Sequence, residues 1–192
     1  SSGACSQACS RLAITKRSIF NILDDNADGS ITTADEGSLG VRLGYMRFNN
    51  CSSDDTGGAY SSGCNKLIKA IGTNYSTINS YVQAESASGG TPLATSLKEA
   101  KLYLDAHKAN DASKNCRQKF VILITDGSDT FACSGDGSEC DPHRYKNRRE
   151  VVAKAKALND AGYKVFVIGF GTAMPRYLRI PLNWAAYYGG TD

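Results

Sequence analysis

Two continuous apolar runs in the second half of the chain constrain the fold more than any other feature. They are FVILITDG at residues 120–127 and KVFVIGFG at residues 164–171. A continuous apolar run that ends in a turn is typical of a parallel strand buried on both faces. A basic helical pattern from about Tyr145 to Ala161, ended by Gly162, lies between the runs. This order predicts a strand–helix–strand unit with two parallel strands.

The rest of the chain continues this alternation of helices and strands. A helix is predicted after Thr91-Pro92, where a capping residue and a first-turn proline precede a regular apolar stripe. Further helices are predicted at residues 11–23, around Lys66 to Ile71 and around Ser76 to Glu85, and a strand at residues 41–48. The pattern predicts an α/β fold with a doubly wound, mostly parallel sheet, whose ligands lie at the carboxyl ends of its strands.

The domain organisation follows from length and from the start of the chain. Its 192 residues fit one core, so we expect a single domain over residues 1–192 with an inserted loop at 24–35. The hydrophobic first central strand of such a sheet is missing, because the chain opens SSGACSQACS and then turns helical. We expect that strand upstream of residue 1, in a larger protein.

The loop at residues 24–35 is the sharpest motif. Its sequence, DDNADGSITTAD, has oxygen side chains at loop positions one, three, five and twelve and glycine at position six. This spacing matches calcium loops, in which alternate residues of a tight turn aim hard oxygens at one ion. The predicted Ca²⁺ ligands are Asp24, Asn26, Asp28, Ser30, Thr32 and Asp35. A solvated polar turn is the alternative. No long helix is expected after the loop, so a structural site is favoured over a sensor.

Cysteine content and charge bear on location and partners. Seven cysteines are many for a cytosolic domain, and their spacing suggests local loop disulfides and therefore export. The suggested pairs are Cys5 with Cys9, Cys51 with Cys64 and Cys133 with Cys140, leaving Cys116 single. Reduced thiols or other pairings are the alternative. The net charge of +3 and a basic cluster without stacking aromatics give no support for nucleic-acid binding, and no segment is apolar enough to span a membrane.

Two segments at the predicted carboxyl edge of the sheet carry further candidate ligands. GGTPLATSL at residues 89–97 places Thr91 before a helix, and LITDGSDT at residues 123–130 places Asp126 after a strand. Both segments resemble von Willebrand factor A domains, whose metal-ion-dependent adhesion site joins such residues to a first-strand DxSxS motif. The resemblance implies Ser2 as the first serine, with the aspartate just before residue 1.

This resemblance implies an adhesion site that binds Mg²⁺ or Mn²⁺ through Ser2, Thr91 and Asp126 and offers an open position to an acidic residue of a partner. Ala4 stands where the second serine belongs, so the site is incomplete. The alternative is that Thr91 only caps its helix and Asp126 only caps the next turn.

Four segments resemble in sequence one branch of that family, the amino-terminal A domain of PilY/PilC-type proteins. These segments are residues 88–105, 116–133, 161–171 and 182–192. This resemblance implies a protein exported through the periplasm to the tip of a type IV pilus. Its implied partners are pilus subunits, the rest of its own chain, or a host or abiotic surface.

Catalysis is not expected. The sequence has no GxSxG or HExxH motif, and His107 and His143 lie in ordinary surface contexts.

An aromatic stripe formed by Trp184, Tyr187 and Tyr188 is expected in the core or at an inter-domain contact. Two alternatives to a calcium-stabilised adhesion module stay open: an A domain that serves a metal-dependent enzyme complex, as in metal-chelatase subunits, and a purely structural domain.

Overall fold

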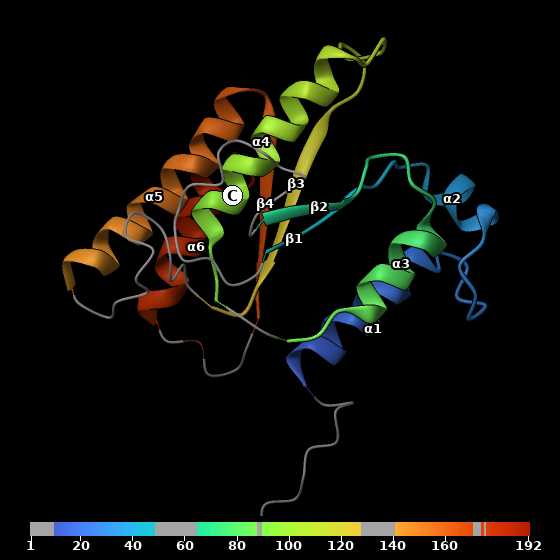
Figure 1. Cartoon of the computed structure of the whole chain (residues 1–192), viewed down its shortest axis with the longest axis horizontal. Coiled ribbons are helices and arrows are strands. Elements are labelled where there is room, and N and C mark those ends of the chain that lie inside the picture. The colour runs from blue at the N-terminus through green and yellow to red at the C-terminus, as the bar shows by residue number, and fades with distance from the viewer. Residues whose placement is uncertain (1–9, 49–64, 88–89, 128–140, 171–173, 175) are drawn as a thin grey trace, which may run out of the picture. The chain divides into compact units, whose positions relative to one another are not determined.

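The structure is a computed structural model that describes residues 10–48, 65–87, 90–127, 141–170, 174 and 176–192. Contacts group the chain into two compact units. Unit 1 comprises Ser1–Met46 and Leu67–Ala87, and unit 2 comprises Arg47–Lys66 and Ser88–Asp192. The elements of both units are labelled in Figure 1.

Unit 1 is helical. Its helices are α1 (Arg11–Leu23), α2 (Thr33–Leu39) and α3 (Tyr75–Ala84). The first helix has the predicted bounds and begins at Ser10, whose hydroxyl accepts the Ala13 N–H. Among the described residues of unit 1, the buried apolar side chains are those of Leu23, Tyr75, Ile78 and Val82.

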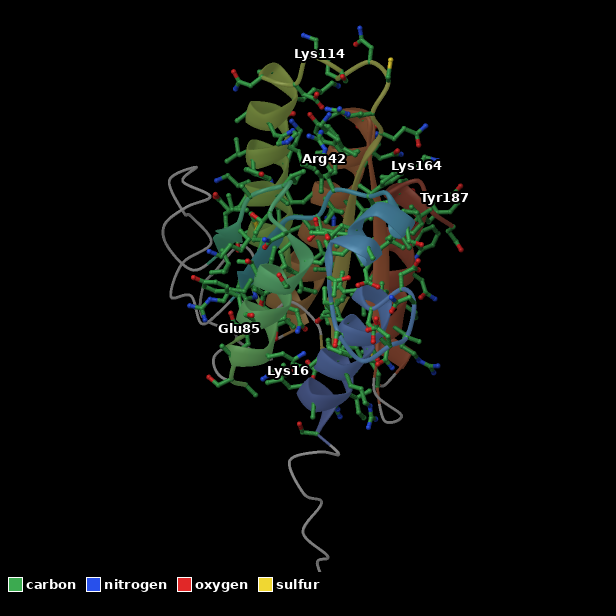
Figure 2. All side chains as sticks on the ribbon, turned by 90° about the vertical axis from the view of Figure 1, so that its right-hand side faces the viewer. Lys16, Arg42, Glu85, Lys114, Lys164 and Tyr187 are labelled. Carbon is green, nitrogen blue, oxygen red and sulfur yellow. The ribbon has the colours of Figure 1, made fainter. Side chains whose placement is uncertain are left out.

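A lysine joins the first and third helices of unit 1. Lys16 Nζ donates hydrogen bonds to the carbonyl oxygens of Gln83 and Glu85, both at 2.6 Å, and Figure 2 shows Lys16 beside Glu85. In return, Gln83 Nε2 donates to the Lys16 carbonyl at 3.2 Å. The ammonium thereby takes up backbone acceptors at the end of α3, where helical partners are absent.

Two short strands lie where the chain passes between the units. β1 (Tyr45–Phe48) and β2 (Asn65–Lys69) pair with each other in a two-stranded sheet. The strand predicted at residues 41–48 is therefore confirmed over its second half. The helix predicted around Lys66 to Ile71 is wrong, because this apolar run is too short for its spacing to separate helix from strand, and pairing with β1 decides the outcome.

Unit 2 contains the predicted strand–helix–strand unit. Its elements are α4 (Leu93–Ala109), β3 (Lys119–Thr125), α5 (Asp141–Asp160), β4 (Tyr163–Gly169) and α6 (Arg176–Tyr188). β3 and β4 are parallel and in register, with Ile122 opposite Phe166 and Thr125 opposite Gly169. The parallel pairing is confirmed. The described strands form two two-stranded sheets, so the wider doubly wound sheet stays an expectation.

Helices cover one face of the β3–β4 sheet. Figure 1 shows α4, α5 and α6 on the same side of the two strands, where Leu123 and Val165 are buried. The apolar side chains of the other face are exposed, at 59% for Ile122 and 42% for Phe166. The continuous apolar runs predict that both faces of the strands are buried, and this prediction is wrong for the described residues. A run of apolar residues indicates that burial is favourable, but it does not show which element covers each face.

The aromatic stripe of α6 lies on the side of that helix away from its buried residues. Trp184, Tyr187 and Tyr188 are each at least 40% exposed, and their ring centroids lie 5.2–5.8 Å apart. Placement of this stripe in the core is therefore wrong. Leu182 and Ala185, on the opposite side, supply the contact with the rest of unit 2.

Gly189 marks the tightest approach between the end of α6 and the sheet. A Cβ at this position would lie 2.6 Å from the Ala185 carbonyl oxygen and 2.8 Å from Val165 Cβ. The backbone is also fixed there, because the Val165 N–H donates to the Gly189 carbonyl at 3.0 Å. A methyl group cannot fit without displacing backbone.

We expect Gly189→Ala to lower the free energy of unfolding by about 1–3 kcal/mol through overpacking. The matched control is Gly37→Ala, because Gly37 lies inside α2 with no atom within 4 Å of an added Cβ. Alanine is favoured over glycine in a helix, so the control should be neutral or slightly stabilising. Urea unfolding of both variants measures the difference. Equal stabilities would contradict the close packing at Gly189.

Candidate functional site

The predicted calcium loop lies between two helices of unit 1. It begins at Asp24, directly after α1, and ends at Asp35, inside the seven-residue helix α2. Two residues within it have positive φ, Ala27 at 55° and Gly29 at 87°. The left-handed conformation at Gly29, the sixth loop position, gives the sharp turn for which this position requires glycine.

Side-chain oxygens of the loop hold its backbone. The Asp24 carboxylate accepts the N–H groups of Asp28 at 3.2 Å and Gly29 at 2.9 Å, one on each oxygen. The Asn26 side-chain oxygen accepts the Asp28 N–H at 3.0 Å, and Asp28 Oδ1 accepts the Ser30 N–H at 2.8 Å. The loop is thus wound around its own acidic side chains, with Asp24 buried.

Asp35 closes the loop from its far end. Its side chain is fully buried and accepts the Thr32 N–H at 2.7 Å, as part of a capping box that starts α2. Its other oxygen accepts the Asn26 N–H at 3.3 Å, which joins the two ends of the loop. The hydrogen bond from the Thr32 backbone is the main cause that lowers the pKa of Asp35 below its usual value.

The loop residues carry oxygen ligands of the kind that calcium binds, but their carboxylates accept hydrogen bonds from backbone N–H groups of the loop. Among the described residues, no group of three or more His, Cys, Asp or Glu side chains is placed to hold a metal ion. A carboxylate oxygen that accepts one hydrogen bond keeps a lone pair for a cation, whereas Asp35 Oδ2 accepts two, from the Thr32 N–H and the Thr32 hydroxyl. An all-oxygen donor set suits Ca²⁺. The fold therefore presents the predicted ligands on one tight loop, and cation binding would require the carboxylates of Asp24, Asp28 and Asp35 to converge.

The loop is joined to the third helix through α2. Glu36, next to Asp35, accepts the Tyr75 N–H at 2.8 Å through Oε1 and so caps the start of α3. The Tyr75 hydroxyl donates to the Val41 carbonyl, and burial raises the pKa of that hydroxyl. A change at the end of the loop therefore reaches α3 through two neighbouring residues.

Thr91 and the segment after β3 meet at the carboxyl edge of the parallel sheet. A Cβ built on Gly127 would lie 3.9 Å from Thr91 Oγ1, which places the threonine hydroxyl beside the residue that follows Asp126. Asp126 is exposed and follows the last residue of β3, Thr125. The Thr125 hydroxyl donates to the Gly127 carbonyl at 3.1 Å and accepts the Gly127 N–H at 3.3 Å, which fixes the turn. The predicted convergence of Thr91 with the Asp126 segment is thus present in unit 2.

Hydroxyl groups near the start of α4 bond back to the residue that precedes the helix. α4 has Pro92 as its capping residue, without a side-chain capping hydrogen bond. The hydroxyls of Thr95 and Ser96 instead donate back to the Pro92 carbonyl, at 3.2 and 2.6 Å. The interpretation of Thr91 as a helix cap stays a prediction, and the structure adds that its hydroxyl lies next to the Asp126 turn.

Other predicted residues lie outside the described part of the chain. These are Ser2 and the six cysteines of the suggested disulfides. Cys116 is described and is an exposed free thiol. Disulfide pairing thus stays a prediction. Among the helices that the structure describes, none has the length and hydropathy needed to cross a membrane.

A buried ion pair at the opposite edge of the sheet was not predicted. Asp111 accepts a hydrogen bond from Lys119 Nζ at 2.8 Å and another from Arg117 at 3.0 Å. The side chains of Asp111 and Lys119 are 3% and 7% exposed. Lys119 is the main cause that lowers the pKa of Asp111 to about 2. No sequence motif predicts that this pair is buried, because oppositely charged residues this close in sequence usually lie at the surface in contact with solvent.

Comparison with known proteins agrees with the fold and with the Thr91 and Asp126 segments. The model of the von Willebrand factor type A domain family matches residues 33–180. The chain therefore belongs to this family. The match includes Thr91 and Asp126 and begins after the first nine residues of the calcium loop. Neither a search of curated proteins nor one of solved structures finds a match. Domains of this family mediate adhesion and other protein–protein interactions.

Proposed function

We propose that this chain is an exported, non-catalytic adhesion or assembly module of a type IV pilus tip-associated protein. It would recognise its partner at the carboxyl edge of β3, through a magnesium- or manganese-type cation bound by Thr91 and Asp126. The observation that carries the proposal is the placement of the Thr91 hydroxyl beside Gly127, next to Asp126. Ser2, outside the described residues, is the third proposed ligand.

The chemistry of these ligands suits recognition of an acidic group. A threonine hydroxyl is neutral and Asp126 supplies a single carboxylate, so a divalent cation held here keeps net positive charge. Such a cation prefers a further oxygen ligand, and an acidic side chain of a partner supplies one. Among the described residues at this edge, Asp126 is exposed, which supports its contact with a macromolecule.

The pilus context rests on sequence resemblance in four segments of the chain. Export is supported by the cysteine spacing, and calcium is available outside the cell at concentrations that suit a structural loop. We therefore propose that Ca²⁺ stabilises unit 1 while the edge of unit 2 makes the adhesive contact, with pilus subunits, other parts of the same protein or a surface ligand as partners.

We expect Asp126→Ala to remove one Mn²⁺ site and to reduce surface attachment. Electron paramagnetic resonance of free Mn²⁺, with Ca²⁺ present to occupy the 24–35 loop, counts bound ions in the purified protein. Attachment is measured with cells that carry the variant in the full-length protein. Asp160→Ala is the matched control, because Asp160 is an exposed aspartate of α5 in a surface ion pair with Lys156.

The two readouts separate the competing functions. Loss of both Mn²⁺ binding and attachment supports the adhesion site. Normal folding and secretion, with both Mn²⁺ binding and attachment unchanged, would support a purely structural domain. Loss of Mn²⁺ binding without loss of attachment would favour an accessory role in an enzyme complex, in which the cation serves another partner.

A further inference from the structure

A polar hollow lies at the edge of unit 2 opposite the Asp126 turn. Its volume is about 270 Å³, and it is bordered by the start of β3, the start of β4 and the segment after α4. The lining residues that carry charge or a thiol are Lys108, Lys114, Cys116, Arg117 and Lys119. Figure 2 shows Lys114 at the extreme of this end of unit 2. This hollow shares no residue with the Thr91 and Asp126 segments.

The hollow has an excess of positive charge. Four of its lining side chains are cations, and Asp111 is the carboxylate that contacts them, through Arg117 and Lys119. Within the described ranges, neither Lys108 nor Lys114 has a carboxylate within ion-pair distance. Lys108 Nζ lies 3.5 Å from the Ala161 carbonyl and 5.3 Å from the centre of the Tyr163 ring. Both lysines are therefore available to an incoming anion.

Two carboxylates near the hollow, on Asp105 and Asp111, already have hydrogen-bond donors within unit 2. Asp111 is held by Lys119, Arg117 and the Ser113 N–H, the last at 3.0 Å. Asp105 accepts Lys101 Nζ at 2.7 Å and the Tyr163 hydroxyl at 2.8 Å. Both internal carboxylates thus have their own hydrogen-bond donors. Lys108 acts on Asp105 only through its charge, which helps to lower the pKa of that carboxyl, so the ammonium groups of Lys108 and Lys114 can each pair with a carboxylate from outside.

The shape and donors of the hollow favour carboxylates over phosphates or nucleic acid. Its guanidinium, on Arg117, already donates to Asp111 through Nη1, which takes up part of the planar fork that suits phosphate. Its aromatic residue, Tyr163, is 2% exposed and gives no surface on which a base can stack. A volume of about nine water molecules holds one or two acidic side chains.

We propose that this hollow binds an acidic segment of a protein partner, with Lys108 and Lys114 pairing with aspartate or glutamate side chains. The contact is independent of metal ions and lies at the other end of the strands from the proposed adhesion site. Unit 2 thereby has two acid-recognising surfaces, one that acts through a cation and one that acts through lysines.

The test uses a fluorescently labelled hexaglutamate peptide and the whole chain in EDTA, with anisotropy as the readout. We expect saturable binding that weakens as salt rises, and at least tenfold weaker binding by a Lys108→Gln/Lys114→Gln variant. Arg149→Gln is the control for loss of a positive charge elsewhere on unit 2, because Arg149 is exposed on α5 about 17 Å before the end of that helix. It should bind as the parent does. Melting temperatures confirm that each variant is folded.

Cys116 supplies a second, local readout. Its alkylation by iodoacetamide, followed by mass spectrometry of the peptide that contains it, should slow when hexaglutamate is bound and stay unchanged with hexaglutamine. Equal affinity of the double variant and Arg149→Gln for hexaglutamate would overturn the proposal. So would tighter binding of a thymidine oligonucleotide or of inorganic phosphate than of hexaglutamate, because the hollow would then select another anion.

Discussion

Calcium should raise the melting temperature of this protein by about 5–10 °C, and an Asp24→Ala/Asp28→Ala variant should lose this response. An ion present at a hundredfold excess over its dissociation constant stabilises the folded state by ~2.7 kcal/mol. In a chain of this length, each kcal/mol moves the melting temperature by about 2–4 °C. Both aspartates hold the loop backbone, so the variant should also melt lower than the parent in chelator.

Asp25→Ala is the matched control for this prediction. Asp25 lies in the same loop and carries the same charge, but it occupies the second position and its carboxylate accepts the Ser38 hydroxyl. It should keep the calcium response. Calorimetric titration should find one Ca²⁺ per chain in the parent and in Asp25→Ala, and none in the double variant. Identical melting curves of the parent in calcium and in chelator would contradict a calcium site at residues 24–35.

Acid should destabilise unit 2 through the Asp111–Lys119 pair. The folded pKa of Asp111, about 2, lies below its ordinary value of 3.8, so the ionised form stabilises the folded state. This contribution is complete above pH 4 and is lost as the pH falls from about 4 to about 2. We expect the melting temperature of the parent to fall more steeply across this window than that of Asp111→Asn.

At neutral pH, Asp111→Asn should itself be strongly destabilising, because it leaves the buried Lys119 ammonium without its carboxylate. Adding Lys119→Met to that variant should recover much of the loss, since removing a whole buried pair costs less than breaking it. Asp160→Asn breaks an exposed pair and should change little. If Asp111→Asn and Asp160→Asn melt alike at pH 7, the pair does not contribute as its burial indicates.

The two units divide the proposed functions between them. Unit 1 carries the proposed calcium loop, and the hydrogen bond from the Tyr75 N–H to Glu36 links the helix at the end of this loop to the start of α3. Unit 2 carries the adhesion edge and the basic hollow, at opposite ends of one pair of parallel strands. Calcium removal is therefore expected to affect stability first, and Asp126→Ala to affect attachment without loss of the calcium response.

Much of the fold could be predicted because local sequence carries it. The helix at Arg11–Leu23 follows from its apolar spacing, and the parallel strands around Ile122 and Phe166 follow from continuous apolar runs. The helix predicted around Lys66 to Ile71 was wrong, because a run of a few residues is too short to show whether its apolar spacing is that of a helix or of a strand. Burial of Trp184 in the core was wrong, and a contact with another domain stays a prediction, because helical spacing fixes which residues share a face and does not fix what that face contacts.

The sequence by itself determined the tight turn at residues 24–35, with glycine at its sixth position, and the end of the strand before Asp126, because both depend on residue type at short, fixed spacing. Tertiary structure alone decided that Thr91 lies beside the Asp126 turn, that Asp111 and Lys119 are buried together, and that the second face of the β3–β4 sheet is exposed. The reason is physical. Spacing along a chain controls what one turn or strand can present, whereas burial and convergence depend on elements far apart in sequence.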